Sequence, residues 1–396
     1  MDIFEKCYAP SLPDELRAKD LFPYFRELQS RQDTEVIMEG QRRLMFGSNN
    51  YLGLTTEPSL IQKAKDTLEE YGTGCSGSRL LNGTLILHQQ FEREMAAFLG
   101  KEEVVTFSTG FQSNLGIISA LVGRSDYIVG DRENHASIYD GCKLSWGKLL
   151  RYDHADMDSL EQQLKKVPES AGCLVVTDGV FSMGGDIAKL PDIVELAKKY
   201  GARVMVDDAH ALGVIGEGGR GTASYFGLTD QVDVYMGTFS KSLASLGGYM
   251  AACAKVADFV RCNSRPYIFS ASVPPACIAV ATASLQYLAA HPQRVERLQQ
   301  LALYMRQKLA QRQIPLRQGG SPIVPIIPLY TYTELRTLKV QKALYERGLY
   351  VNASVPPATP PGECLLRCSL IATHTEAQID EAVDIIAAVL GEYKED

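Results

Sequence analysis

Short apolar runs alternate with longer amphipathic segments through the middle of the chain. The runs are rich in Val, Tyr, Ala and Met and predict strands at residues 104–107, 127–129, 174–177, 204–206, 232–236 and 249–253. The segments between and before them predict helices at residues 88–100, 112–122, 138–148, 191–200 and 256–263. This alternation is typical of an α/β fold with a mostly parallel central sheet wrapped by helices, in which ligands gather at the carboxyl ends of the strands.

The pattern changes after Pro274 and Pro275. The remaining sequence predicts two long helices, a pair of strands and a final helix, at residues 276–290, 295–312, 322–330, 365–370 and 376–390. A chain of 396 residues exceeds one ordinary hydrophobic core. We therefore expect an N-terminal arm, a large domain and a smaller α+β C-terminal domain, at residues 1–47, 48–275 and 276–396.

The N-terminal arm is charged and prone to helix between residues 11 and 41. Leu16, Leu21, Phe25 and Leu28 give it a partial apolar face. This face is too weak to favour a membrane surface, so we expect the arm to pack on the body of the protein or on a partner chain.

Composition excludes several classes of protein. Hydrophobic residues make up 45% and charged residues 22%, which is typical of a globular protein, and the net charge of −7 without a basic block argues against nucleic acid as a partner. No apolar run reaches the length of a membrane span, and residues 1–10 lack the pattern of a signal peptide, so we expect a cytoplasmic protein. The 9 cysteines are scattered, which favours reduced thiols over disulfides or a metal site.

Two loops in the first hundred residues are candidates for ligand contact. The turn at residues 48–54 carries Asn49 and Asn50, either of which could donate to a ligand carboxylate or simply form the turn. Residues 71–84 hold four glycines, so their backbone must pass close to a partner subunit or to a ligand's phosphates.

The strand ends in the large domain carry polar residues suited to chemistry. The strand, turn and helix at residues 104–114 leave free backbone amides at Gly110 and Phe111, which can bind a phosphate. His135 follows the next strand and could stack on a planar cofactor or move a proton, or equally bond its neighbours at a helix start.

Two further strand ends supply an acid and an amine. Asp207 follows a hydrophobic strand, where a carboxylate needs a cation such as a protonated pyridine nitrogen; a magnesium ligand or a helix cap is the alternative. Lys241 lies among small hydroxyl residues in GTFSKSLASLGG. In an enclosed pocket its amine would lose proton affinity and become a nucleophile able to form a Schiff base with an aldehyde cofactor, whereas in a polar loop it would be solvated.

The chain has a phosphate-binding turn, a histidine, an aspartate and a lysine, each after a strand. This arrangement resembles that of the pyridoxal phosphate enzymes of fold type I, the aspartate-aminotransferase-like fold. The segments GTGCSGSRLLNGT, DRENHAS, TDGVFSMGGDIAKLP, VMVDDAHALGVIGEGGRG and GTFSKSLASLGGY resemble motifs of the α-oxoamine synthase family, class II acyltransferases that depend on pyridoxal 5'-phosphate. The resemblance runs from about residue 48 to the C-terminal helix.

The resemblance implies roles for individual residues. Lys241 would hold the cofactor as a Schiff base and move a proton at the substrate α-carbon, Asp207 would bind the pyridine nitrogen, and His135 would stack on the ring. Residues implied to complete the cofactor site are His210 and Ser182 near the ring hydroxyl, Gly110, Phe111, Thr238 and Ser240 at the phosphate, and Ser270 from the partner subunit. Asn49, Arg367 and Ser78 would bind substrate.

The implied reaction is the decarboxylative condensation of an amino acid with an acyl-CoA, in a homodimer with shared active sites. GSRLLNGT and PPATP are most similar to bacterial members that join L-serine to a palmitoyl chain. Members using L-alanine with a pimeloyl thioester, or glycine with an acetyl group, are the alternatives. Some bacterial members carry an arginine directly before PPATP, where this chain has Val355. From other classes, a non-catalytic subunit would lack Lys241, and an aminotransferase or aldolase of the same fold would lack both GSRLLNGT and PPATP.

Overall fold

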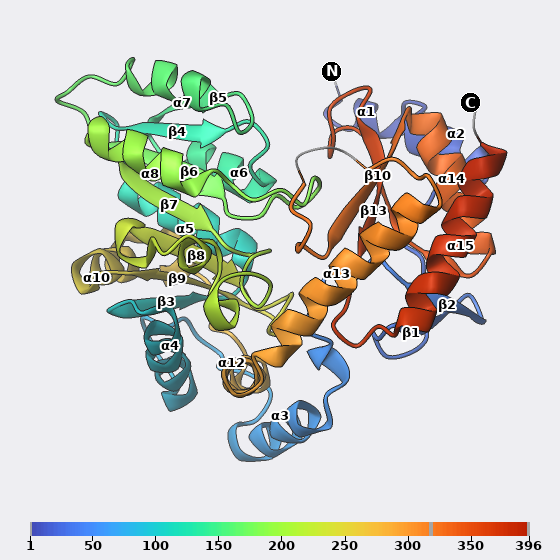
Figure 1. Ribbon diagram of the computed structural model, residues 1–396. Coiled ribbons are helices and arrows are strands. Elements are labelled where there is room, and N and C mark those ends of the chain that lie inside the picture. The colour runs from blue at the N-terminus through green and yellow to red at the C-terminus, as the bar shows by residue number, and fades with distance from the viewer. Residues whose placement is uncertain (1, 317–319, 394–396) are drawn as a thin grey trace.

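A seven-stranded sheet forms the larger of two bodies in the computed structural model, which describes residues 2–316 and 320–393 (Figure 1). Its strands lie in the order β3 (Glu103–Phe107), β9 (Gly248–Ala252), β8 (Val234–Thr238), β7 (Arg203–Asp207), β6 (Cys173–Asp178), β4 (Tyr127–Asp131) and β5 (Lys148–Tyr152). Strand β9 is antiparallel to β3 and β8, and the pairings from β8 to β5 are parallel. The predicted mostly parallel sheet is confirmed.

All six strands predicted for this sheet are present. The seventh, β5, was not predicted, because its sequence KLLRY offers only two consecutive apolar residues between Lys148 and Arg151, and it lies at the sheet edge, where only Tyr152 is fully buried. The helix predicted at residues 138–148 therefore ends earlier, at Leu144.

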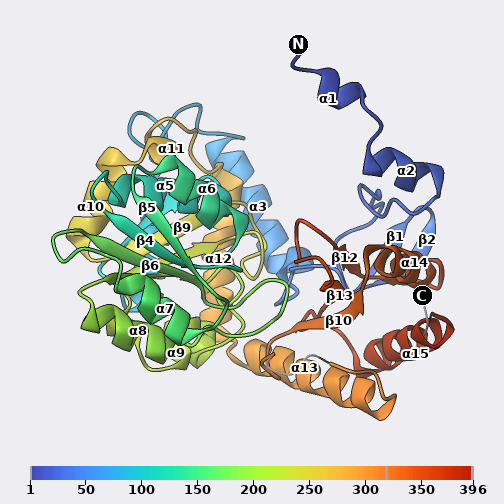
Figure 2. The same ribbon diagram turned by 90° about the horizontal axis from the view of Figure 1, so that it is seen from above.

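Helices cover both faces of this sheet (Figure 2). One face packs against α5 (Gly110–Leu121), α6 (Ala136–Leu144) and α10 (Ala254–Asn263), and the other against α4 (Ile86–Leu99), α7 (Met157–Leu164), α8 (Leu190–Lys199) and α12 (Pro275–Ala290). Neighbouring strand residues such as Val104 and Val105 belong to opposite cores, as the two-residue period of a strand requires. Shorter or peripheral elements are α3 (Pro58–Tyr71), α9 (Thr222–Tyr225), α11 (Arg265–Ile268) and the 3-10 turns Leu54–Thr56, Glu217–Gly219 and Thr229–Gln231.

The smaller body is built from both ends of the chain. Its antiparallel sheet has the order β10 (Ile326–Tyr332), β13 (Cys364–Ser369) and β12 (Asn352–Ser354), with helices α13 (Gln293–Gln311), α14 (Glu334–Glu346) and α15 (Glu376–Glu392). A second small sheet joins β1 (Glu35–Met38) and β2 (Gln41–Met45) to β11 (Leu349–Tyr350). Leu44 and Phe46 share one buried cluster with Leu366 and Ile386.

The N-terminal arm differs from the prediction. It is helical only at α1 (Glu5–Tyr8) and α2 (Leu12–Ala18), neither of which buries a residue, and Figure 2 shows α1 at the outer end of the chain. The predicted helix-prone segment extends to residue 41, but the structure has strand β1 at residues 35–38, so this part of the prediction is wrong. In β1, buried Val36 and Met38 alternate with exposed Glu35 and Ile37, a period of two that specifies a strand.

The division at residue 275 stays a prediction. Ile278 and Leu285 of α12, which follow residue 275, pack in the core of the large sheet. Leu44 of β2, which precedes residue 48, packs in the core of the smaller body. Within the described ranges, no helix has both the length and the apolar character needed to cross a membrane.

Candidate functional site

Two adjoining cavities lie at the carboxyl ends of the large sheet's parallel strands, and His135, His210 and Lys241 line both. The deeper cavity, of about 270 Å3, is also lined by Gly110, Phe111, Asp178, Asp207, Thr238 and Ser240. The outer cavity, of about 430 Å3, also contacts Asn49, Ser182 and Arg367 and is walled by residues of the smaller body. The fold thus brings together most of the residues singled out from the sequence.

Lys241 follows strand β8 by three residues, in a loop tied down at both sides. Ser242 Oγ donates to the Leu212 carbonyl at 2.6 Å, and the amide of Ala244 donates to the carbonyl of Lys241 at 3.1 Å. Burial lowers the pKa of Lys241 to about 8, against the opposing effect of the Asp207 and Asp178 carboxylates. A considerable share of this amine is therefore neutral near physiological pH and can act as a nucleophile.

Asp207 is the last residue of β7 and lies in the wall of the deeper cavity. Its Oδ1 accepts the amide of Ala209 at 2.9 Å, and its Oδ2 accepts the side-chain amide of Asn114 at 2.7 Å. Each carboxylate oxygen has a second lone pair, so the group can still accept a hydrogen bond from a cationic ligand.

Asp178 ends the neighbouring strand and pairs with Asp207 in the register of β6 and β7. Burial, followed by the charge of Asp207, raises the pKa of Asp178 well above its usual range. Its Oδ2 accepts the backbone amide of His135 at 3.0 Å. Sequence reasoning missed this acid, although it follows a hydrophobic strand just as Asp207 does.

Another part of the deeper cavity's lining is suited to an anion. Thr109 caps helix α5, and its hydroxyl accepts the amide of Gln112 at 3.1 Å, which leaves the amides of Gly110 and Phe111 at the first turn. A Cβ at Gly110 would come within 2.7 Å of Thr238, so only glycine fits there. The Thr238 hydroxyl lies 3.0 Å from the Ser240 hydroxyl.

Arg367 lies on β13, the central strand of the smaller sheet, and is only 4% exposed. Its guanidinium donates to the Ser182 carbonyl, to Ser369 Oγ at 2.8 Å and to Tyr51 Oη at 3.0 Å. Tyr51 Oη in turn lies 2.7 Å from His210 Nδ1. Burial, followed by the positive charges of Lys241 and Arg367, lowers the pKa of His210 well below its usual range, so this ring is neutral. Tyr51 is another residue that sequence reasoning missed, within a turn it had marked.

Ser78 and Ser270 line neither cavity of this chain. Ser270 Oγ accepts the side-chain amide of Gln112 at 3.0 Å, and the Ser78 carbonyl accepts the amides of Leu81 and Gly83. Both assignments stay predictions, and the one for Ser270 invokes a partner subunit.

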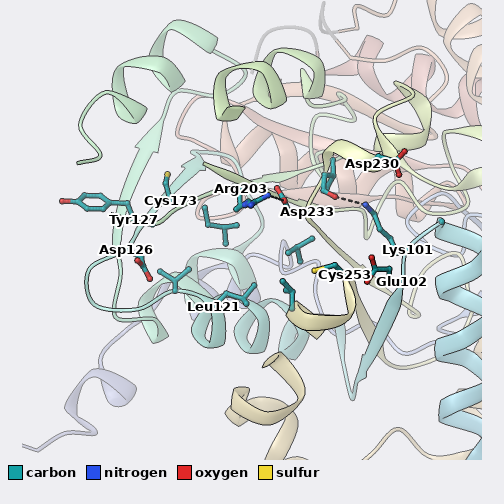
Figure 3. A pocket seen from close by; sticks show the side chains of 17 residues that line it. Lys101, Glu102, Leu121, Asp126, Tyr127, Cys173, Arg203, Asp230, Asp233 and Cys253 are labelled. Carbon is teal, nitrogen blue, oxygen red and sulfur yellow. Dashed lines mark hydrogen bonds and ion pairs between the residues drawn. The ribbon is translucent and has the colours of Figure 1, made fainter. Parts of the chain in front are cut away.

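A separate cavity of about 600 Å3 lies at the opposite, amino-terminal edge of the strands (Figure 3). It contains none of the candidate residues. Its charged side chains are largely satisfied within the chain: Lys101 donates to the Thr229 and Val232 carbonyls, and Arg203 pairs with Asp233 at 2.8 Å. The two cavities around Lys241 are therefore the candidate active site.

Comparison with known proteins agrees with this geometry. Residues 42–386 match the model of the class I and II aminotransferase family. The chain belongs to this family. It is 51% identical over 379 residues to a serine palmitoyltransferase from Sphingobacterium spiritivorum, covering 96% of this chain and 94% of the relative. It is 44% identical over 377 residues to an 8-amino-7-oxononanoate synthase from Citrifermentans bemidjiense, covering 94% of this chain and 96% of that one.

Solved structures of the family show the same architecture. A serine palmitoyltransferase from S. paucimobilis with a bound PLP–myriocin aldimine superimposes with a TM-score of 0.95 at 36% identity, over 100% of both chains. An 8-amino-7-oxononanoate synthase from Francisella tularensis gives a TM-score of 0.76 at 27% identity, covering 88% of this chain and 98% of that one. The predicted family and fold type are confirmed.

A histidine outside the cavities, His154, links two acidic residues and so fixes a loop that lines the outer cavity; we call this arrangement the His154 clamp. His154 donates from Nδ1 to Asp131 and from Nε2 to Asp186, both at 2.9 Å, and Glu133 lies 3.6 Å from Nε2. Asp186 belongs to the loop that carries Ser182 and Met183 into the outer cavity. Burial opposes the charged ring, but the hydrogen bonds to Asp131 and Asp186 raise its pKa to about 10.

Replacing His154 by glutamine is expected to lower stability in a pH-dependent way. Because the folded pKa is raised from 6.5 to about 10, the contribution of His154 is fully present below pH 6.5 and is lost as the pH rises to about 10. The difference in urea midpoint between wild type and variant should therefore shrink over that interval. Lys143→Gln is the matched control, because it removes an exposed cation from its ion pair with Asp140 and should change the midpoint little. A difference that stays constant from pH 6 to 10 would contradict the clamp.

Proposed function

We propose that this protein is a pyridoxal 5'-phosphate-dependent acyltransferase that condenses L-serine with palmitoyl-CoA to 3-ketodihydrosphingosine, releasing CO2 and CoA. The observation that carries the proposal is that the Lys241 amine and the Asp207 carboxylate line one small cavity, which opens toward the guanidinium of Arg367. The choice of substrates is supported by relatives named serine palmitoyltransferase at 51% and 47% identity, against 44% for the 8-amino-7-oxononanoate synthase from C. bemidjiense.

The residues of the deeper cavity fit the cofactor. The Lys241 amine would hold its aldehyde, Asp207 would hold its ring nitrogen protonated, and the first turn of α5 with Thr238 and Ser240 would bind its phosphate. Gly110 keeps that phosphate seat open, because any side chain there would collide with Thr238. When bound, pyridoxal 5'-phosphate supplies an electron sink for bonds broken at the substrate α-carbon.

The chain's own side chains supply binding and proton transfer. With its pKa lowered to about 8, Lys241 can take a proton from the substrate α-carbon and return it later. Arg367 offers a fixed, buried cation for the amino acid carboxylate, and its bonds to Ser369 and Tyr51 keep the guanidinium in place. Asn49 lines the same outer cavity and can donate to that carboxylate.

We also propose a homodimer with shared active sites. Leu80, Leu81 and Phe269 are 56%, 77% and 76% exposed beside Ser78 and Ser270, the two candidate residues that do not reach the site of their own chain. Large apolar side chains exposed in this way fit burial by a second copy.

A substrate matrix tests the proposal. Gly, Ala, Ser and Thr are each combined with acetyl-, pimeloyl- and palmitoyl-CoA, and release of the CoA thiol is measured against a control without amino acid. We expect L-serine with palmitoyl-CoA to give the highest kcat/KM. Shorter acyl chains should lose up to about fourfold per methylene, because burying a methylene contributes about 0.8 kcal/mol. Highest activity with alanine and pimeloyl-CoA would instead assign the 8-amino-7-oxononanoate synthase reaction.

A further inference from the structure

Asp207 and His135 are joined by hydrogen bonds through two residues that have no assigned role. Asn114 Nδ2 donates to Asp207 Oδ2 at 2.7 Å and to Ser137 Oγ at 2.8 Å. Ser137 Oγ lies 2.7 Å from His135 Nδ1. Asn114 and Ser137 are at most 1% exposed, so water does not compete for these bonds.

The direction of each bond follows from the chemistry of its partners. The Asp207 carboxylate can only accept, so the nitrogen of the Asn114 amide must face it, and the second hydrogen of that nitrogen goes to Ser137 Oγ. This orientation leaves Asn114 Oδ1 buried without a partner among the described residues. A buried acceptor without a hydrogen bond lowers stability, so the orientation of Asn114 is set by its bonds to Asp207 and Ser137.

The state of the His135 ring follows from the same bonds. The backbone amide of Ser137 donates to His135 Nδ1 at 3.3 Å, and a backbone amide cannot reverse its role. Nδ1 is therefore an acceptor, and the Ser137 hydroxyl, which already accepts from Asn114, is free to donate its own proton to Nδ1. With Nδ1 occupied by two donors, the proton of a neutral ring must lie on Nε2.

The backbone of His135 is fixed as well, because Asp178 Oδ2 accepts its amide at 3.0 Å. Burial lowers the pKa of the ring, against the effect of Asp207. The ring is therefore held neutral and in one orientation, in the wall that the two cavities share.

We propose that Asn114 and Ser137 are positioning residues that couple Asp207 to His135 and hold His135 as its neutral, Nε2-protonated tautomer. The ring then presents an N–H donor, and never an acceptor at that nitrogen, to a ligand in the site. This inference deepens the proposed function and rests on it for its catalytic consequence, but the tautomer itself is a property of the protein without cofactor.

The tautomer can be measured directly. Protein labelled with 15N-histidine and freed of cofactor is studied by two-bond 15N–1H correlation spectra at pH 7.5, with the His135 signals assigned by their loss in His135→Asn. We expect a protonated Nε2 and an unprotonated Nδ1. A protonated Nδ1, or a fully charged ring, in the wild-type protein would overturn the proposal whether or not the enzyme condenses serine with palmitoyl-CoA.

Ser137→Ala tests the coupling. The variant keeps only the longer backbone donor to Nδ1, so the His135 signals should move part of the way toward the tautomer average, and kcat/KM for the preferred substrate pair should fall about tenfold. The urea midpoint should also fall, because the second hydrogen of Asn114 Nδ2 loses its buried acceptor. Ser284→Ala is the matched control, since this serine is also fully buried in a helix but its hydroxyl has no partner among the described residues. Wild-type His135 signals and wild-type kcat/KM in Ser137→Ala would overturn the proposal.

Discussion

Alanine in place of Lys241 is expected to reduce turnover by at least about 10³-fold. The variant loses the nucleophilic amine and also the group that moves the α-proton, and general acid–base catalysis alone contributes about 10²–10⁴-fold. Wild-type protein mixed with pyridoxal 5'-phosphate should show the visible absorbance of a Schiff base, and the variant should show only that of the free aldehyde. CoA release from palmitoyl-CoA and serine gives the rate.

Lys255→Ala provides the comparison for that experiment. Lys255 is an exposed lysine on α10, away from both cavities of the site, and its loss should leave absorbance and turnover at wild-type values. Retention of either signal in Lys241→Ala would mean that another amine holds the cofactor and would end the mechanism proposed for this site.

Asparagine in place of Asp207 is expected to reduce kcat/KM by about 10²–10³-fold, the range found when a preorganised electrostatic contact in an active site is removed. A neutral amide cannot hold the ring nitrogen of the cofactor protonated, so the electron sink weakens. The Asp207 carboxylate also raises the pKa of Lys241, against the effect of burial. The variant should therefore have a Lys241 pKa below about 8, and a pH profile of Schiff-base absorbance displaced toward lower pH.

The adjacent carboxylate offers a matched control. Asp208 is as buried as Asp207, but its Oδ2 accepts the amide of Thr222 at 3.0 Å and it lines neither site cavity. Burial raises the pKa of Asp208 to about 7, so asparagine resembles a form it already adopts near neutral pH. Asp208→Asn should keep most of the activity. Equal losses in the two variants would indicate a general disturbance of the β7 end and no special role for Asp207.

The sequence was sufficient to predict the residues that end strands. Asp207 and Thr238 end parallel strands of one sheet, with Lys241 and His135 three and four residues beyond a strand end, so the topology alone brings them together. Asn114, Ser137 and Tyr51 could not be found in this way. They lie inside helices or a turn, and what distinguishes them is a partner contributed by a distant element, which no local pattern encodes.

Helices α3, α7 and α14 were not predicted, and two strand errors have a similar origin. Strand β5 is a half-exposed edge strand whose charged residues weaken the apolar signal, and β1 follows a charged arm whose composition favours helix. In both cases a neighbouring strand decided the local conformation, because pairing with it satisfies backbone groups that the isolated segment could satisfy equally well as a helix. Ser78 and Ser270 are a different case, since their assignments can be judged only with a second copy present.

The pairing of Leu44 in β2 with Leu349 in β11 also has a consequence for biosynthesis. Strands β1 and β2 emerge first and can pair with each other, but β2 gains its second neighbour, β11, only when most of the chain has been made, while every strand of the seven-stranded sheet is available much earlier. A nascent chain would thus complete the half carrying Lys241 first and gain Arg367 only near release. The amine and the guanidinium would face each other only once translation is nearly over, so a truncated product could carry the lysine but lack its arginine counterpart.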